Sequence, residues 1–257
     1  PLASTAKKRA LLIGISHYPQ TTRNNPCTWT NIHGSNDVRL LRGTLQKQGF
    51  RITTLTHAQA TASHIRRALK RLCQQAAKGD MVVIHFSVHF ATHGFAISTM
   101  QQYDNSPFAQ SRTAFTPNGN YMMWSGLVLA GGNNAWQCKP LPKGVEDGIL
   151  TADEISRLDL SHTRLVVLSA CETARGHIDN TDGVWGLQRA FKQAGAGTIV
   201  MTLWKVSDET TCMFMTEFYR QLANGLNTRQ ALKRARTYLI EQGATDPYYW
   251  AAFVAID

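Results

Sequence analysis

Apolar residues in this chain form short runs that alternate with amphipathic stretches. Nearly continuous apolar runs at residues 10–15, 81–87 and 165–169 predict strands that are buried on both faces of a sheet. Apolar positions at helical spacing predict helices over residues 35–48 and 61–77. Strands that alternate with helices over short connections predict a parallel sheet with right-handed crossovers.

The rest of the chain continues this alternation. Further strands are predicted at 50–56, 198–203 and 250–256, and further helices at 183–194, 208–224 and 228–242. Together the elements predict an α/β three-layer sandwich, in which a six-stranded, mainly parallel sheet lies between two layers of helices. We expect residues 1–257 to form a single domain, and the 43% of hydrophobic residues suffices to cover both faces of its sheet.

The middle of the chain, about residues 96–148, has a different composition. It is rich in Asn, Gln, Ser, Gly and Pro, and predicts only one strand, at 125–130. A segment of this length inside a compact domain is usually functional or mobile. We therefore expect a mobile insertion, after which a capping box at residues 151–154 opens a short helix.

The number and spacing of the cysteines indicate the cellular compartment and the kinds of cofactor to expect. The five cysteines are scattered without CxxC spacing, which argues against a disulfide framework and against a zinc site. Together with the absence of Asn-x-Ser/Thr sites, this favours a reducing, cytoplasmic compartment. The chain contains no apolar run of about 18 residues, so no membrane contact is expected. No metal or other cofactor is expected either.

The net charge of +10 raises the question of a nucleic-acid partner. Much of this charge falls on the helical stretches 66–71 and 229–236, without interleaved aromatic residues, which is typical of solvated helix faces. An acidic partner, or a nucleic acid reached through a larger complex, is the alternative. A nucleotide-binding domain is poorly supported, because the chain lacks both GxGxxG and GxxxxGK[ST].

Two predicted strands run directly into residues that can react. Cys171 follows the strand at 165–169, and His93, followed by Gly94, stands beyond the strand at 81–87. Ligands of open α/β sheets bind at the carboxyl ends of the strands, where a thiolate, an imidazole and free backbone N–H groups can meet. The alternative is a structural role for Cys171, since a lone cysteine at a strand end is commonly an inert core residue. These residues alone leave both interpretations open.

Several longer motifs resemble, in order and spacing, those of the CHAT-type caspase-like cysteine peptidases. The motifs occupy residues 91–95, 147–155, 168–173, 183–195, 203–206 and 248–253. The N-terminal segments 10–15 and 36–38 are similar to the wider clan of caspases, metacaspases and separases. The likeness to the CHAT-type peptidases runs from about residue 85 to the C-terminus.

The resemblance implies a thiol endopeptidase that acts on protein substrates through a Cys/His dyad. By motif, Cys171 matches the nucleophile, His93 the catalytic histidine, and Gly94 the residue whose N–H helps to bind the oxyanion. The resemblance also implies a regulatory protein partner or an attached domain.

The histidine motif departs from the clan pattern. His89 occupies the expected strand-end position, but Val88 and Phe90 replace the flanking glycines, and a complete His93–Gly94 motif follows four residues later. Strand length favours His89, because a strand from 81 to 92 would be about twice the usual length. Chemistry favours His93, because only Gly94 supplies an unobstructed N–H, and we predict His93 as the base.

Two further consequences of the resemblance stay open. Metacaspase-like relatives often carry an Asp two residues before the nucleophile, which favours basic substrate residues, whereas this chain has Ser169 there. A preference for Arg or Lys is therefore not predicted from this position. The altered first histidine motif also leaves a catalytically silent signalling or interaction module as the alternative to an active peptidase.

Overall fold

The main sheet has six strands. The computed structural model describes residues 6–18, 31–92, 125–132, 147–169, 182–204 and 206–257. The strands are β1 (Lys8–Gly14), β2 (Arg51–Thr56), β3 (Met81–Ser87), β7 (Leu165–Leu168), β8 (Thr198–Thr202) and β9 (Phe253–Ile256), in the order β2-β1-β3-β7-β8-β9. All neighbouring pairs are parallel except β8 and β9. The predicted six-stranded, mainly parallel sheet is confirmed.

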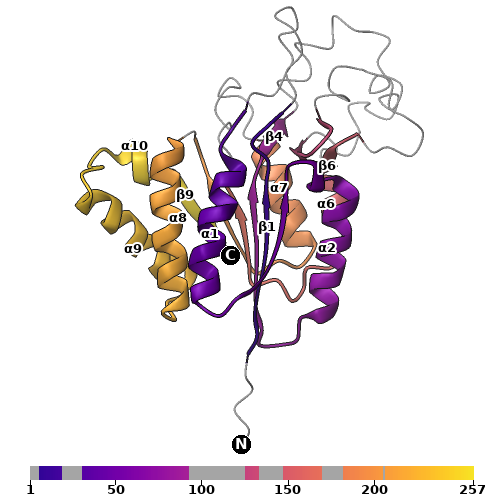
Figure 1. Cartoon of the computed structure of the whole chain (residues 1–257), viewed down its shortest axis with the longest axis horizontal. Coiled ribbons are helices and arrows are strands. Elements are labelled where there is room, and N and C mark those ends of the chain that lie inside the picture. Colours follow the sequence, from indigo (N-terminus) through magenta and orange to yellow (C-terminus); the bar gives the residue numbers. More distant parts are fainter. Residues whose placement is uncertain (1–5, 19–30, 93–124, 133–146, 170–181, 205) are drawn as a thin grey trace, which may run out of the picture.

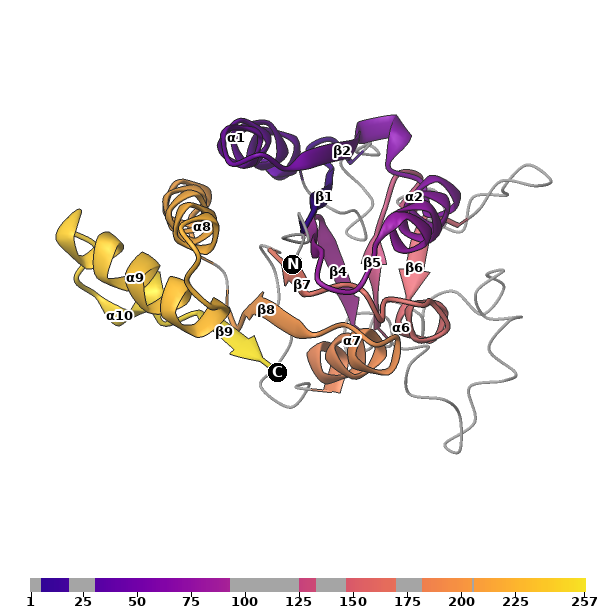
Figure 2. The same cartoon turned by 90° about the horizontal axis from the view of Figure 1, so that it is seen from below.

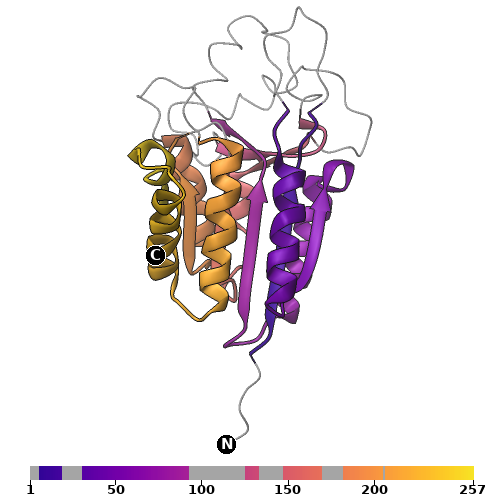
Figure 3. The same cartoon turned by 60° about the vertical axis from the view of Figure 1, so that its left-hand side comes forward.

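Helices cover both faces of this sheet. Figures 1 and 2 show α1, α8 and α9 on one face, with α2 and α7 on the other, and Figure 3 shows α1 and α8 side by side in front of the strands. These helices are α1 (Gly34–Lys47), α2 (Ala62–Gln75), α7 (Asp182–Gln193), α8 (Asp208–Ala223) and α9 (Thr228–Glu241). The three-layer arrangement predicted from the sequence is therefore present.

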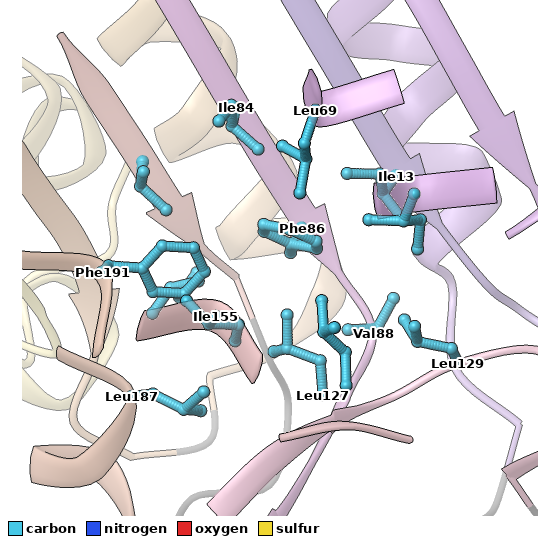
Figure 4. Packing of buried hydrophobic residues seen from close by; sticks show 14 of the residues in the cluster. Ile13, Leu69, Ile84, Phe86, Val88, Leu127, Leu129, Ile155, Leu187 and Phe191 are labelled. Atoms are coloured by element: carbon cyan, nitrogen blue, oxygen red, sulfur yellow. The ribbon is translucent and has the colours of Figure 1, made fainter. Parts of the chain in front are cut away.

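Alternation along the strands divides the core into two clusters. On β1, Leu11 and Ile13 join the cluster under α2 and α7, whereas Leu12 joins the cluster under α1, α8 and α9. Figure 4 shows the first cluster, in which Phe86 of β3 packs near Phe191 of α7 with ring centroids 5.9 Å apart. Apolar burial on both sides explains the nearly continuous apolar runs of the central strands.

A second sheet stands beyond the carboxyl end of β3. It contains β4 (His89–Thr92), β5 (Ser125–Val128) and β6 (Ile149–Thr151), in the antiparallel order β4-β5-β6. The sequence predicts β5 but not this sheet, because the residues of β4 read as a continuation of β3. The chain instead changes sheets at Val88, so the strand-length argument made from the sequence does not apply.

The C-terminal strand is shorter than predicted. The sequence predicts a strand over 250–256, but Trp250 ends α10 (Pro247–Trp250), a turn follows, and β9 begins at Phe253. The Asp246 side chain accepts a hydrogen bond from the backbone N–H of Tyr248, and Pro247 takes the first helical position, where its missing N–H costs nothing. Cap and proline together explain the extra helical turn.

Most basic residues of the two helical stretches are exposed, as the sequence predicts, and three arginines also contact other elements. Arg66 of α2 forms an ion pair with Glu154 of α6 (Ala152–Ser156), and Arg229 of α9 pairs with Asp257. Arg236 donates a hydrogen bond to the carbonyl oxygen of Phe253. These arginines connect elements far apart in the sequence, and the Arg229 side chain is still 72% exposed.

No helix in the described ranges is long and apolar enough to span a membrane. Within the same ranges, no group of three or more His, Cys, Asp and Glu side chains is placed to hold a metal ion.

Candidate active site

The strands that lead toward the two predicted catalytic residues are neighbours. β3 pairs with β7 in parallel, with Phe86 opposite Leu168, and one residue further the backbone N–H of Ser169 donates to the carbonyl oxygen of Phe86 at 2.8 Å. Both strands therefore leave the sheet at the same carboxyl edge, at the top of Figure 1. Cys171 follows two residues after Ser169 and lies outside the described residues.

The predicted base and oxyanion residue also lie outside the described part of the chain. His93 and Gly94 directly follow β4, whose last residue is Thr92. β4 continues from β3 through Val88, so the segment that carries both histidine motifs starts from the strand beside β7. The fold thus brings together the strands that precede the nucleophile and the base.

The competing histidine, His89, is enclosed by protein. It is 0% exposed, and its ring lies 4.8 Å from that of the buried Tyr18. The Tyr18 hydroxyl accepts from the backbone N–H of His89 at 3.2 Å and donates to the carbonyl oxygen of Val128 at 3.0 Å. Burial raises the pKa of Tyr18, which keeps this hydroxyl neutral and able to donate.

His85, which lies within the strand predicted at 81–87, forms a buried polar pair. Its Nδ1 lies 3.0 Å from the hydroxyl of Tyr219 on α8. Burial lowers the pKa of His85 to about 3 and raises that of Tyr219, so both groups are neutral. A cavity of about 10 Å³ adjoins His85, Ser169 and Cys212. This volume is about what a single water molecule requires.

An acidic residue missed by the sequence reasoning lies close to the same edge. Ser87, the last residue of β3, donates a hydrogen bond of 2.6 Å to Asp37 in the first turn of α1. Burial raises the pKa of Asp37 to about 6, against the opposing effect of the Ser87 hydrogen bond. His33 pairs with Asp208, which links the beginnings of α1 and α8. The Asn36–Asp37 pair was the only sequence signal for this group.

Aromatic side chains gather where β8 leaves the sheet. Trp204, two residues beyond β8, stacks on Tyr248 with ring centroids 6.4 Å apart, and its indole N–H donates to the Tyr248 carbonyl oxygen. Leu203, Tyr248 and Tyr249 are 47%, 51% and 38% exposed. Trp204 thus packs against the core near a strand end, beside an exposed apolar surface next to the end of β7.

Comparison with known proteins connects this fold to a family. The human protein "Tetratricopeptide repeat protein 28" is 30% identical over 178 residues, which cover 67% of this chain but 7% of that protein. "Metacaspase-7" of Arabidopsis thaliana is 33% identical over 85 residues, 32% of this chain and 21% of that protein. The chain thus matches only a small part of each of these relatives.

A solved structure supports the same fold. Gingipain R, described as an Arg-specific cysteine proteinase, aligns with a TM-score of 0.53 and 11% identity over 96% of this chain and 45% of its own. This likeness shows a caspase-like fold. The family model described as "CHAT domain" matches residues 1–257. The chain belongs to the CHAT domain family.

Proposed function

We propose that this chain is a cysteine endopeptidase in which Cys171 is the nucleophile and His93 the general acid and base. The observation that carries the proposal is the parallel pairing of β3 with β7, extended by the hydrogen bond from Ser169 to Phe86. Strands that end at one edge can deliver a thiol and an imidazole to one crevice. Membership of a family with a caspase-like fold supports the same chemistry.

The proposed reaction needs only groups of the chain and water. The Cys171 thiolate attacks the scissile carbonyl carbon, while the backbone N–H groups of Gly94 and Cys171 stabilise the oxyanion. Protonated His93 gives its proton to the leaving amine as the C–N bond breaks, which leaves a thioester. Water then attacks the thioester, with neutral His93 accepting the proton, and the carboxylate product departs as the thiolate is restored.

Two arguments bear on the choice of base. His89 stands three residues beyond Phe86, just as Cys171 stands three beyond Leu168, so counting from the paired residues favours His89. The complete enclosure of His89 against Tyr18 favours His93, because a general base must reach its substrate. We retain His93, since Phe90 beside His89 would also crowd a substrate carbonyl.

An interaction module without catalytic activity is the second candidate. It is favoured by the burial of His89, the histidine at the clan's usual position. The match to a small part of a large tetratricopeptide repeat protein also suggests a module that works beside other domains. We propose a regulatory protein partner or attached domain in either case, and a cytoplasmic location, which the scattered cysteines support.

A cleavage profile on a peptide library tests the proposal. We expect wild type to cut a defined set of peptides, and Cys171→Ala to cut none. A peptidyl electrophile directed at thiols should label wild type and should not label Cys171→Ala. Labelling should also be lost in His93→Ala. Absence of both cleavage and labelling in wild type would favour the interaction module instead.

A further inference from the structure

A basic groove lies at the amino ends of β1 and β2. The amino end of β1 is at the bottom of Figure 1, opposite the carboxyl edge that carries the candidate active site. The volume of the groove is about 480 Å³, and its lining includes Lys7, Lys8, Arg9 and Arg51 but no acidic residue. We call this feature the amino-end groove. Four basic side chains are thus clustered in one concave site of a chain whose net charge is +10.

The two arginines of this groove stand side by side. Arg9 of β1 and Arg51 of β2 are register partners, so their side chains leave the sheet on the same face. Like charges directly opposite each other on neighbouring strands are destabilising. The Asp80 carboxylate, 3.7 Å from Arg9 Nε, offsets part of this cost, and a bound anion near both guanidinium groups would offset more.

Arg9 is buried in an ion pair with Asp80 that leaves its Nε without a hydrogen bond to the described part of the chain. The residue is only 7% exposed, and among the described residues its Nε has no hydrogen-bond partner. The Asp80 carboxylate lies 3.7 Å from this Nε, too far for a hydrogen bond. Asp80 already accepts from the backbone N–H groups of Lys7 and Ala77. A buried guanidinium fork with an unused donor fits an incoming oxyanion.

The remaining lysines have different roles. Lys8 contacts the carbonyl oxygen of Gln48 at 3.4 Å and lies 5.8 Å from the centre of the Phe50 ring, so the protein itself uses this ammonium group. Lys7 is exposed beside the groove. Lys7 and Arg51 are therefore the exposed cations of the groove, and Arg9 is the buried cation in its lining.

We propose that the amino-end groove binds the carboxylates of an acidic segment of a partner protein. A peptide fits better than a nucleic acid, because the groove lining contains no aromatic side chain on which bases could stack. Among the described strands, β2 ends the order of the main sheet, and Arg51 and Thr53 on it are exposed. An edge strand can accept an extended peptide, so the groove and the edge together offer charge and backbone contacts. This inference does not depend on peptidase activity.

Fluorescence anisotropy with the 257-residue chain tests the proposal. The probe is a short labelled peptide of alternating Glu and Gly, with the matching Gln peptide as the uncharged control. We expect the Glu peptide to bind, with an affinity that falls as salt rises. The double variant Lys7→Gln/Arg51→Gln should weaken binding at least about tenfold, as expected for lost charge-assisted hydrogen bonds.

A charge-matched variant separates the groove from net charge. Arg67→Gln/Lys70→Gln removes the same two charges from exposed positions on α2 and should change affinity less than about twofold. Arg9→Lys keeps the charge but loses the fork, and should also weaken binding, with thermal unfolding as the check on folding. Equal losses in both double variants would overturn the proposal. So would groove-dependent binding of inorganic phosphate or a single-stranded oligonucleotide without binding of the Glu peptide.

Discussion

The backbone N–H of Ser169 donates to the carbonyl oxygen of Phe86, one residue beyond the last paired residues of β7 and β3. This contact extends the pairing of the two strands as far as Ser169, which stands two residues before Cys171. It matters because the proposed chemistry requires the ends of neighbouring strands to face one crevice. The same hydrogen bond fixes Ser169 beside Phe86, the position from which the chain continues toward Cys171.

The Tyr18 hydroxyl joins the start of β4 to β5, and its removal should destabilise the second sheet. Tyr18→Phe leaves the buried N–H of His89 and the carbonyl oxygen of Val128 without this bridge. We expect a loss of about 1–3 kcal/mol in the free energy of unfolding, measured by urea denaturation. Tyr248→Phe, at an exposed position, is the control and should lose much less. Equal stability of the Tyr18 variant and wild type would contradict the bridging role.

Asp37→Asn should stabilise the protein at neutral pH. Because the pKa of Asp37 is raised to about 6 in the fold, the folded state holds a proton that the unfolded chain has lost above about pH 4. The contribution of Asp37 to the free energy of unfolding of wild type therefore falls as pH rises toward 6, and it is constant above pH 6. Asparagine avoids this loss and can still accept from Ser87. We expect a gain of about 1–3 kcal/mol at pH 7 and little change below pH 4.

Asp80→Asn is the matched control with the opposite sign. Backbone hydrogen bonds from Lys7 and Ala77 lower the pKa of Asp80, so its ionised form favours folding. The asparagine variant should lose stability at pH 7 and approach wild type in acid. Urea unfolding at both pH values measures the two variants side by side. A stabilised Asp80→Asn, or a pH-independent Asp37→Asn, would refute the assignment of these carboxyl groups.

The buried pair of His85 and Tyr219 should make the protein sensitive to acid. Because the pKa of His85 is lowered to about 3, the unfolded chain takes up a proton first as pH falls below about 6.5. Stability from this group is therefore present at neutral pH and is lost on acidification, by up to about 1.4 kcal/mol per pH unit. The double variant His85→Phe/Tyr219→Phe removes both polar partners and should show a shallower decline between pH 6.5 and 4. An unchanged slope would argue that His85 is not the responsible group.

The fold was largely readable from the sequence, because buried strands and amphipathic helices have distinct periodicities. Runs such as residues 10–15 and 165–169 became β1 and β7 nearly as predicted. The change of sheet at Val88 was not readable, since His89 and the residues after it suit the end of β3 as well as the start of β4. Pairing with β5, far along the chain, decides between these possibilities.

The candidate site was readable only in part. Cys171 and His93 were selected by motif, and the structure describes the strands that precede them. Asp37 and the pair of His85 with Tyr219 were missed, because their significance depends on burial and on contacts across 50 and 134 positions. Long-range packing of this kind leaves no local pattern in the sequence.

Tyr248→Ala should weaken substrate binding without slowing the chemical step, if the aromatic surface beyond β8 contacts substrate as part of the proposed peptidase site. Tyr248 is 51% exposed and stacks on Trp204 beside the end of β7. We expect KM to rise several-fold, because the variant loses the binding free energy of about one aromatic contact with the substrate. The value of kcat should be nearly unchanged. Leu40→Ala, on the equally exposed surface of α1, should change neither constant. A fall in kcat with unchanged KM would count against a contact of this kind.

The pH dependence of Cys171 alkylation, mapped by mass spectrometry, tests the central claim most directly. Burial raises the pKa of Cys73 and Cys212, so these two thiols serve as internal controls that react slowly at pH 6. The account predicts that Cys171 alkylates at pH 6 through a thiolate paired with His93, and that His93→Ala shifts this reactivity to higher pH while His89→Ala does not. Alkylation of Cys171 no faster than that of Cys73 and Cys212, or unchanged by His93→Ala, would contradict it.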